Sequence, residues 1–256
     1  MRICIDPGHT FGSNPSPANE AYCEGTRMFT LARFLRRALE RYGAEVVCTR
    51  GRVTDDPSDG ERGRMGRGCA LLLSLHSNAV ASGHNENVDY VSVIYPASRR
   101  GERLAQELSE VIADVMGTRQ PPQFLVRRSA ARDADHDPVM RIAAQTGAVA
   151  LHVEHSFHTN PRTAQWLRSD ENLRRLAEAE AALIAEACGL SLPETRYELL
   201  QDVKTPRYRA TLEKLARRGL LDGWGEGETR RLDLGEDSLR LLTLLDRAGV
   251  FDLGNL

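Results

Sequence analysis

Residues 2–9 read RICIDPGH, a short apolar run that leads through an Asp-Pro-Gly turn to a histidine. The run predicts a strand, and the Pro-Gly pair ends it in a turn. In open α/β sheets, functional residues gather beyond the carboxyl ends of the strands. His9 is therefore a candidate for chemistry at the end of the first strand.

Apolar runs of this kind alternate with longer helical patterns through the first three quarters of the chain. The expected strands and helices are, in chain order, 2–5, 24–43, 44–50, 69–76, 88–96, 98–117, 147–157 and 160–190. Strands that alternate with helices of this length predict an α/β domain. We expect a twisted, mostly parallel sheet of about six strands with helices on both faces, because its strands are continuous apolar runs.

The composition changes near Leu192, where a charged connector begins. Two short helical patterns follow, ended by Gly219 and Gly249 and joined by a Gly-rich loop. We therefore expect one domain over 1–192 and a small helical unit over 203–256. About 50 residues is small for independent folding, so this unit is expected to pack on the main domain or to form a homodimer with another copy.

Composition excludes several classes of partner. The formal net charge is -2, so no broad basic field indicates nucleic acid. No apolar run approaches the roughly 20 residues that cross a bilayer, so we expect no membrane insertion. The N-terminus lacks the apolar segment of a signal peptide, and we expect synthesis in the cytoplasm. The five cysteines are scattered without a CxxC pair, which favours free thiols.

Three apolar runs end in groups suited to metal or proton chemistry, namely His9, His76 and Glu154, and Glu24 opens the first long helix. Two imidazoles, one carboxylate and an open position form a catalytic zinc site, and a further glutamate can transfer protons. The spacing alone leaves a second interpretation open, because no short motif such as HExxH is present. In that interpretation the histidines are satisfied in the core or lie at the surface.

The ordered set of segments carries a resemblance. IDPGH, a glutamate opening the next helix, VVCTR, SLHSNA and VALHVEHSFHTNP follow one another along residues 1–190. Together they resemble the zinc-dependent N-acetylmuramoyl-L-alanine amidases of the type 3 family, which are peptidoglycan hydrolases of bacteria and phages. The resemblance implies an enzyme that cleaves the amide between the lactyl group of N-acetylmuramic acid and L-alanine of the stem peptide.

Carried over to this chain, the resemblance implies that His9, Glu24 and His76 bind one Zn²⁺ and that Glu154 is the catalytic acid/base. Glu20 is the alternative to Glu24. Two other functions remain open: a catalytically silent wall-binding protein of the same fold, and a zinc peptidase acting on stem-peptide bonds. Without a signal peptide, an endolysin or autolysin would reach the wall through a holin, lysis or another non-classical route.

Further candidates surround this set. The expected substrate contacts are Asn78, Arg128, His155 and His158. His152 shares strand parity with Glu154, so it is expected to support the site from a second shell or to be a buried, hydrogen-bonded histidine. Thr10 and Ser156 stand where the family usually has glycine, which affects the expected fit of the substrate. The C-terminal unit resembles half of an S-layer-homology-like module, which implies wall binding or self-association.

Overall fold

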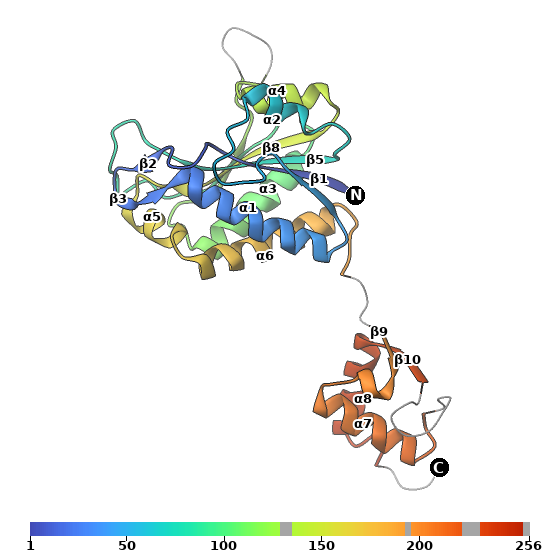
Figure 1. Cartoon of the computed structure of the whole chain (residues 1–256). Helices are drawn as coiled ribbons and strands as arrows, with labels where there is room; N and C mark the ends of the chain where they lie inside the picture. The colour runs from blue at the N-terminus through green and yellow to red at the C-terminus, as the bar shows by residue number, and fades with distance from the viewer. Residues whose placement is uncertain (129–134, 193–195, 222–230, 253–256) are drawn as a thin grey trace. The chain divides into compact units, whose positions relative to one another are not determined.

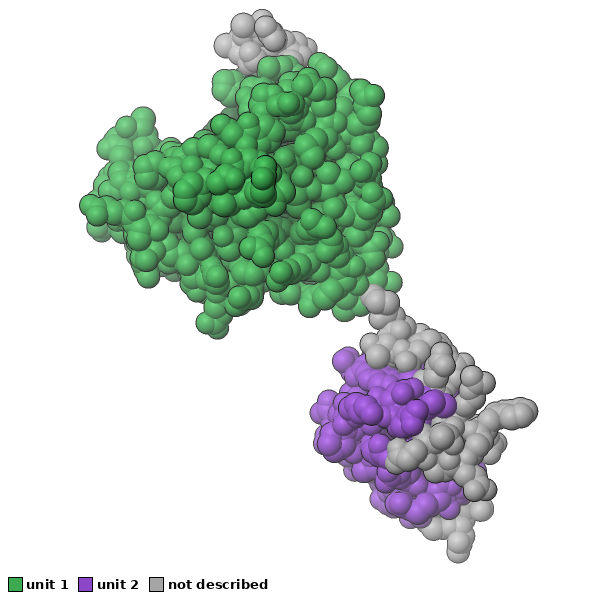
Figure 2. Space-filling view, in the orientation of Figure 1, with its two compact units in different colours: residues 1–192 green, residues 193–256 purple. Residues whose placement is uncertain are grey.

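The computed structural model describes residues 1–128, 135–192, 196–221 and 231–252. The chain forms two compact units, Met1–Leu192 and Pro193–Leu256 (Figure 2). The Gly-rich loop expected between the last two helices falls mainly on 222–230, outside the described residues. Each unit is described by itself.

A six-stranded sheet forms the centre of the described part of the first unit (Figure 1). Its strands are β1 (Arg2–Pro7), β4 (Glu45–Cys48), β5 (Leu71–Asn78), β6 (Ser92–Ile94), β7 (Gln123–Leu125) and β8 (Val149–Phe157). They are ordered β4-β1-β5-β8-β6-β7, and the β6–β8 pair is antiparallel while the other pairs are parallel. The predicted mostly parallel α/β sheet is confirmed.

Helices cover both faces of this sheet (Figure 1). One layer holds α1 (Glu24–Arg41), α3 (Glu102–Met116) and α6 (Asp170–Ala187). The opposite layer holds α2 (Asp59–Arg64) and α4 (Pro138–Gln145). A short antiparallel pair, β2 (Pro15–Ser16) and β3 (Asn19–Cys23), precedes α1, and α5 (Pro161–Leu167) follows β8. The larger hydrophobic core lies under the three-helix layer, since α6 packs against both α1 and α3.

Side chains alternate between the two faces along each strand. On β1, Ile3 and Ile5 enter the larger core, whereas Cys4 enters the smaller core with α4. Asp6 is the next residue of β1 that points to the same side as Cys4. It is fully buried, and its carboxylate forms an ion pair with Arg62 of α2. The face under α2 and α4 is therefore apolar where the strands begin and polar where they end.

The same change occurs on the two central strands. Ser74 of β5 pairs in register with His152 of β8, and His76 pairs with Glu154. Because residues paired in register project to the same side of the sheet, these four polar side chains share the face that carries Asp6. The polar side chains near the carboxyl ends of β1, β5 and β8 therefore lie together on this face, and they position the site.

The second unit contains two helices and a strand pair. Its elements are β9 (Arg196–Leu199), the 3₁₀ turn η1 (Leu200–Asp202), α7 (Pro206–Arg217), β10 (Arg231–Gly235) and α8 (Glu236–Arg247). The antiparallel β9–β10 pair differs from the expected purely helical unit, and β9 precedes the expected start at residue 203. A four-residue strand whose partner lies about 30 residues away gives too little local signal to be predicted. Within the described residues, no helix combines the length and apolar character needed to cross a bilayer.

Candidate active site

His9 lies in a tight turn directly after β1. Its backbone has a φ of 59°, a left-handed conformation that costs a non-glycine residue on the order of 1–3 kcal/mol. Two hydrogen bonds hold the turn. The Arg50 Nη1 group donates to the His9 carbonyl oxygen at 2.7 Å, and the Gly8 amide donates to the Leu75 carbonyl oxygen at 2.9 Å. The strained turn thus presents the imidazole beside β5.

Glu24 is the first residue of α1, where the helix dipole favours a negative charge. Its side chain is buried, and Oε1 accepts a hydrogen bond from the Ser77 amide at 3.0 Å. The same oxygen lies 3.0 Å from His76 Nδ1 and 3.4 Å from His9 Nε2. Burial alone would raise the pKa of Glu24, but the interactions with His76 and His9 outweigh it and hold this pKa far below its ordinary value. Glu24 is therefore a negatively charged carboxylate that lies close to the rings of both His76 and His9.

The neighbours of His76 fix the orientation of its ring. Ser74 Oγ donates its single proton to Asp6 Oδ2 at 2.6 Å, because an ionised carboxylate only accepts. His76 Nε2 lies 3.2 Å from the same hydroxyl, so Nε2–H must donate to it. Nδ1 is directed at Glu24 Oε1, 3.0 Å away, so it is the ring nitrogen that would bind a metal on losing its proton.

The ligand atoms of His9, Glu24 and His76 all lie within 4.8 Å of one another. Two imidazoles and one carboxylate form a ligand set that suits zinc and leaves a coordination position open. Glu20, the alternative predicted from the sequence, is an exposed residue of β3 and does not belong to this cluster. The structure therefore brings together the three residues that the resemblance implied.

Glu154 lies beside this cluster, as the partner of His76 across β5 and β8. Its Oε1 accepts a hydrogen bond from His152 Nε2 at 3.0 Å. Its Oε2 is buried and has no hydrogen-bond partner among the described residues. Burial raises the pKa of Glu154, yet the hydrogen bond and charge of His152 more than offset this and keep the pKa below its ordinary value. The carboxylate is thus ionised and has one oxygen free to accept a proton.

His152 connects three other groups of the site. Its Nδ1 donates to Asp137 Oδ2 at 3.1 Å, and its ring stacks on that of His76 with centroids 4.3 Å apart and an interplanar angle of 4°. Burial lowers the pKa of His152, but the hydrogen bonds to Asp137 and Glu154 raise it to about 10. Sequence reasoning missed Asp137. Its one local signal, a position before Pro138 at the start of a helix, indicates an N-cap and not a contact with β8.

His155 and His158 are buried, with 0% and 1% of their surfaces exposed. His155 Nδ1 donates to the His76 carbonyl oxygen at 2.8 Å, and its Nε2 lies 2.9 Å from Glu180 Oε1. His158 Nδ1 donates to the Ser77 carbonyl oxygen at 2.9 Å. Neither ring offers surface to a substrate. Their burial argues against the predicted contact with substrate, and their hydrogen bonds hold the backbone around His76.

The other expected substrate contacts are more accessible. Asn78 ends β5 and is half-buried, and its side chain accepts a hydrogen bond from the Ala79 amide. Arg128 is exposed and forms a β-bridge with Asp135. Asn78 lies at the carboxyl end of β5, beside the site. Arg128 follows β7, which runs opposite to β5, so the carboxyl end of β7 points to the other edge of the sheet. A contact with substrate stays a prediction for each.

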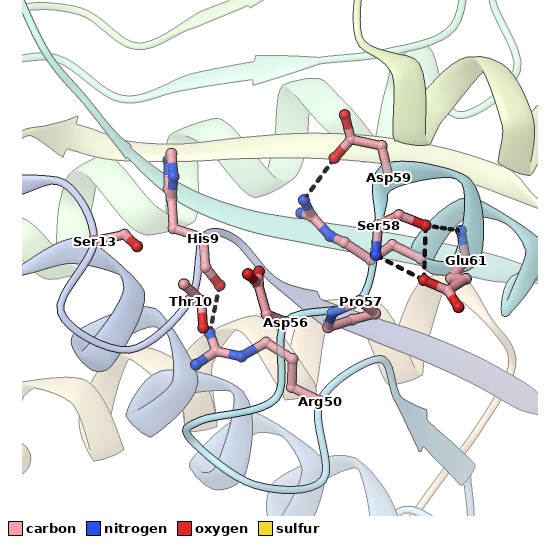
Figure 3. Close-up of a pocket in the computed structure, with 10 residues that line it drawn as sticks. His9, Thr10, Ser13, Arg50, Asp56, Pro57, Ser58, Asp59 and Glu61 are labelled. Atoms are coloured by element: carbon pink, nitrogen blue, oxygen red, sulfur yellow. Dashed lines mark hydrogen bonds and ion pairs between the residues drawn. The ribbon is translucent and has the colours of Figure 1, made fainter.

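An open cavity of about 620 Å³ adjoins the cluster on the side of His9 (Figure 3). One wall is the turn after β1 with Arg50, and the other is the segment from Asp56 to Arg62, which includes the first turn of α2. Thr10 lies in the first wall and binds the Asp55 carbonyl oxygen through its hydroxyl at 3.2 Å. The residue that replaces the usual glycine thus helps to shape the cavity beside the candidate metal ligands.

Comparisons with known proteins identify the fold and the family. A family described as N-acetylmuramoyl-L-alanine amidase matches residues 3–186. An N-acetylmuramoyl-L-alanine amidase from Clostridium difficile 630 is 20% identical at a TM-score of 0.62, with 73% of this chain and 96% of that chain covered. The catalytic domain of CwlV from Bacillus (Paenibacillus) polymyxa is 17% identical at a TM-score of 0.58, with 74% and 99% covered.

Cwp6 from Clostridium difficile is also similar, at 21% identity and a TM-score of 0.62 over 72% of this chain. The match spans 29% of the Cwp6 chain. No curated protein sequence matches significantly. At these identities the solved structures show a shared fold, and the family match extends over most of the first unit.

Proposed function

The chain belongs to the N-acetylmuramoyl-L-alanine amidase family, and we propose that it performs peptidoglycan hydrolysis with a zinc ion held by His9, Glu24 and His76. The bond cleaved is the amide between the lactyl group of N-acetylmuramic acid and L-alanine of the stem peptide. The observation that carries the proposal is the position of Glu154, which lies beside a three-residue ligand cluster with a buried oxygen left unpartnered among the described residues.

The three residues fit zinc in the chemistry of their side chains and in how the surrounding groups orient them. The hydrogen bond from His76 Nε2 to Ser74 directs Nδ1 toward Glu24 Oε1, and Glu24 is ionised despite its burial. When bound, zinc would supply Lewis-acid chemistry, activating a water and the amide carbonyl. The residues of the chain would hold the ion, orient the amide and transfer the proton.

We assign the proton transfer to Glu154. Oε2 would accept a proton from the attacking water and then donate it to the departing amine of L-alanine. The proton returns to solution with the amine, so the carboxylate is regenerated for the next turnover. The hydrogen bond from His152 to Oε1 keeps the group ionised between turnovers.

The cavity beside His9 gives the substrate its place. It is open to solvent and directly adjoins the ligand cluster, as a polymeric substrate such as peptidoglycan requires. We place the scissile amide next to the cluster and part of the muropeptide between the Thr10 wall and the segment from Asp56 to Arg62. Asn78, at the carboxyl end of β5, and Arg128, after β7, are further proposed contacts.

Two measurements on one sample test the proposal. Mass spectrometry of digested peptidoglycan should show free L-alanine amino termini and intact glycan strands, and metal analysis should find about one zinc per chain. Cleaved stem-peptide or cross-bridge bonds would instead indicate a peptidase. Intact peptidoglycan, with zinc bound, would indicate a catalytically silent wall-binding protein.

For the second unit we propose wall binding or self-association, with 1–192 as the catalytic domain. Exposed leucines support a contact surface there, since Leu241 and Leu244 of α8 are 57% and 62% exposed. Sedimentation of the full chain with and without purified peptidoglycan separates the two roles. A homodimer forms without the wall, whereas a wall-binding module leaves a monomer that sediments with peptidoglycan.

We further propose that the protein is a phage or bacterial lytic enzyme. It would act on the wall after release by a holin, lysis or another non-classical route.

A further inference from the structure

The two oxygens of the Glu154 carboxylate have different surroundings. Oε1 accepts a hydrogen bond from His152 Nε2 at 3.0 Å, whereas Oε2 is buried and unpartnered among the described residues. A buried polar atom without a partner costs on the order of 1–3 kcal/mol. One oxygen is thus fixed while the other is kept available at a cost in stability.

His152 is itself held on two sides. Asp137 Oδ2 lies 3.1 Å from Nδ1, and because carboxylates only accept, both ring nitrogens of His152 must donate. The ring also stacks face to face on His76, with centroids 4.3 Å apart. Asp137 is fixed in turn, since its Oδ1 caps α4 by accepting a hydrogen bond from the Met140 amide at 2.8 Å. These contacts therefore hold the His152 ring in one orientation.

We propose that His152, oriented by Asp137, is the positioning residue for Glu154. It binds Oε1 and thereby makes Oε2 the oxygen that takes the proton, at a fixed distance from the cluster that contains His76. This inference rests on the proposed amidase function, since it assigns a role to residues around the proposed base. His152 need not touch the substrate, and its contribution is to reduce the conformations open to the Glu154 carboxylate.

A matched pair of variants isolates this role. In His152→Gln the side-chain amide reaches about as far as Nε2, so it can still donate to Glu154 but not to Asp137. In His152→Asn the shorter amide reaches about as far as Nδ1, so it can meet Asp137 but not Glu154. Both variants lose the ring, its stacking on His76 and its charge. They differ in which carboxylate keeps a donor.

The readouts are kcat and KM on a soluble muropeptide, zinc per chain and the midpoint of thermal unfolding. We expect His152→Asn to lower kcat about 10- to 100-fold, the range known for residues that orient a reacting group. His152→Gln should recover most of that loss, and KM and zinc content should stay at wild-type values in both. A merely structural role would lower kcat equally in the two variants, and that result would overturn the proposal.

Asp137→Ser supplies an independent test if either histidine variant fails to fold. Serine retains an N-cap for α4 but is too short to reach His152, so the ring loses its orientation while the helix keeps its cap. We expect kcat to fall several-fold with KM unchanged, and a wild-type kcat would contradict the role of Asp137. If the wild-type enzyme releases no L-alanine amino termini, the proposed function itself fails. A failure confined to the variants concerns the positioning role alone.

Discussion

Gly8 lies against the ring of His76, so close that a Cβ atom at residue 8 would stand 2.1 Å from Cε1 of that ring. Glycine is therefore required for this close contact between the turn and the His76 ring. We expect Gly8→Ala to displace either the turn or His76 and to lower zinc affinity at least about tenfold. Gly51→Ala is the matched control, because its backbone lies outside the left-handed region and a Cβ there comes no closer than 3.6 Å, to Asp55 Oδ2. Competition with a chelating dye measures both, and equal affinities would contradict the prediction.

Glu154→Gln is expected to abolish turnover while zinc stays bound. The amide has the shape of the carboxylate but cannot accept the proton, and general acid–base catalysis contributes about 10²- to 10⁴-fold to a rate. Glu20→Gln is the control, since Glu20 is an exposed carboxylate outside the cluster. Muropeptide turnover and metal analysis are measured on both variants. Activity of Glu154→Gln within tenfold of wild type would remove Glu154 from the role of base.

The sequence predicted the sheet because its strands are apolar runs between amphipathic helices, and it placed His9, His76 and Glu154 at strand ends. These features depend on local patterns. The contacts of His152 with Asp137 and of His155 with Glu180 could not be predicted, because each joins residues 15 or 25 positions apart whose meeting depends on how a helix packs on the sheet. The sequence pattern predicts His155 as a substrate contact because it follows Glu154 at the strand end. The burial of His155 under α6 depends on tertiary packing, which no local pattern indicates.

Removal of zinc should inactivate and destabilise the enzyme. Ligand binding to the folded state stabilises it by about 2.7 kcal/mol when the ligand is present at 100 times its Kd. We therefore expect chelator-treated protein to unfold at a lower temperature and to regain both stability and activity with Zn²⁺. Mg²⁺ should restore neither, because it prefers oxygen ligands to imidazoles. Thermal unfolding before and after addition of each metal tests this, and an unchanged midpoint with zinc would count against a metal site.

Asp6 is expected to be a main determinant of stability. The buried carboxylate accepts hydrogen bonds from Thr49, Ser74 and two nitrogens of Arg62. Burial raises the pKa of Asp6, but the hydrogen bonds and charge of Arg62 outweigh it and lower the pKa below the ordinary 3.8. Asp6→Asn breaks a buried ion pair, so we expect a loss of about 3–5 kcal/mol in the free energy of unfolding at neutral pH.

The pH dependence of that loss follows from the direction of the pKa shift. A carboxyl whose pKa is lowered in the folded state stabilises the protein above its unfolded pKa, and the stabilisation is lost as the pH falls through the folded pKa. The difference between wild type and Asp6→Asn should therefore be full at pH 7 and shrink below about pH 3.8. Asp59→Asn, which removes the exposed partner of the same Arg62, should cost about 0–1 kcal/mol. Urea unfolding of the wild type and both variants across this pH range measures these free energies. A loss in Asp6→Asn that is independent of pH would refute the ionic role of Asp6.

Ser156 keeps a glycine-like backbone although it carries a side chain, with a φ of 57°. Its hydroxyl donates to Asp89 Oδ1 at 2.9 Å in a fully buried position. Ser156→Ala retains the left-handed strain and loses the hydrogen bond, so it should destabilise the protein by about 1–3 kcal/mol. Ser156→Gly also loses the bond but relieves a strain of about 1–2 kcal/mol, so it should be the more stable of the two. Urea unfolding of both variants measures the difference, and an alanine variant as stable as the glycine variant would show that the strand-end turn carries no strain.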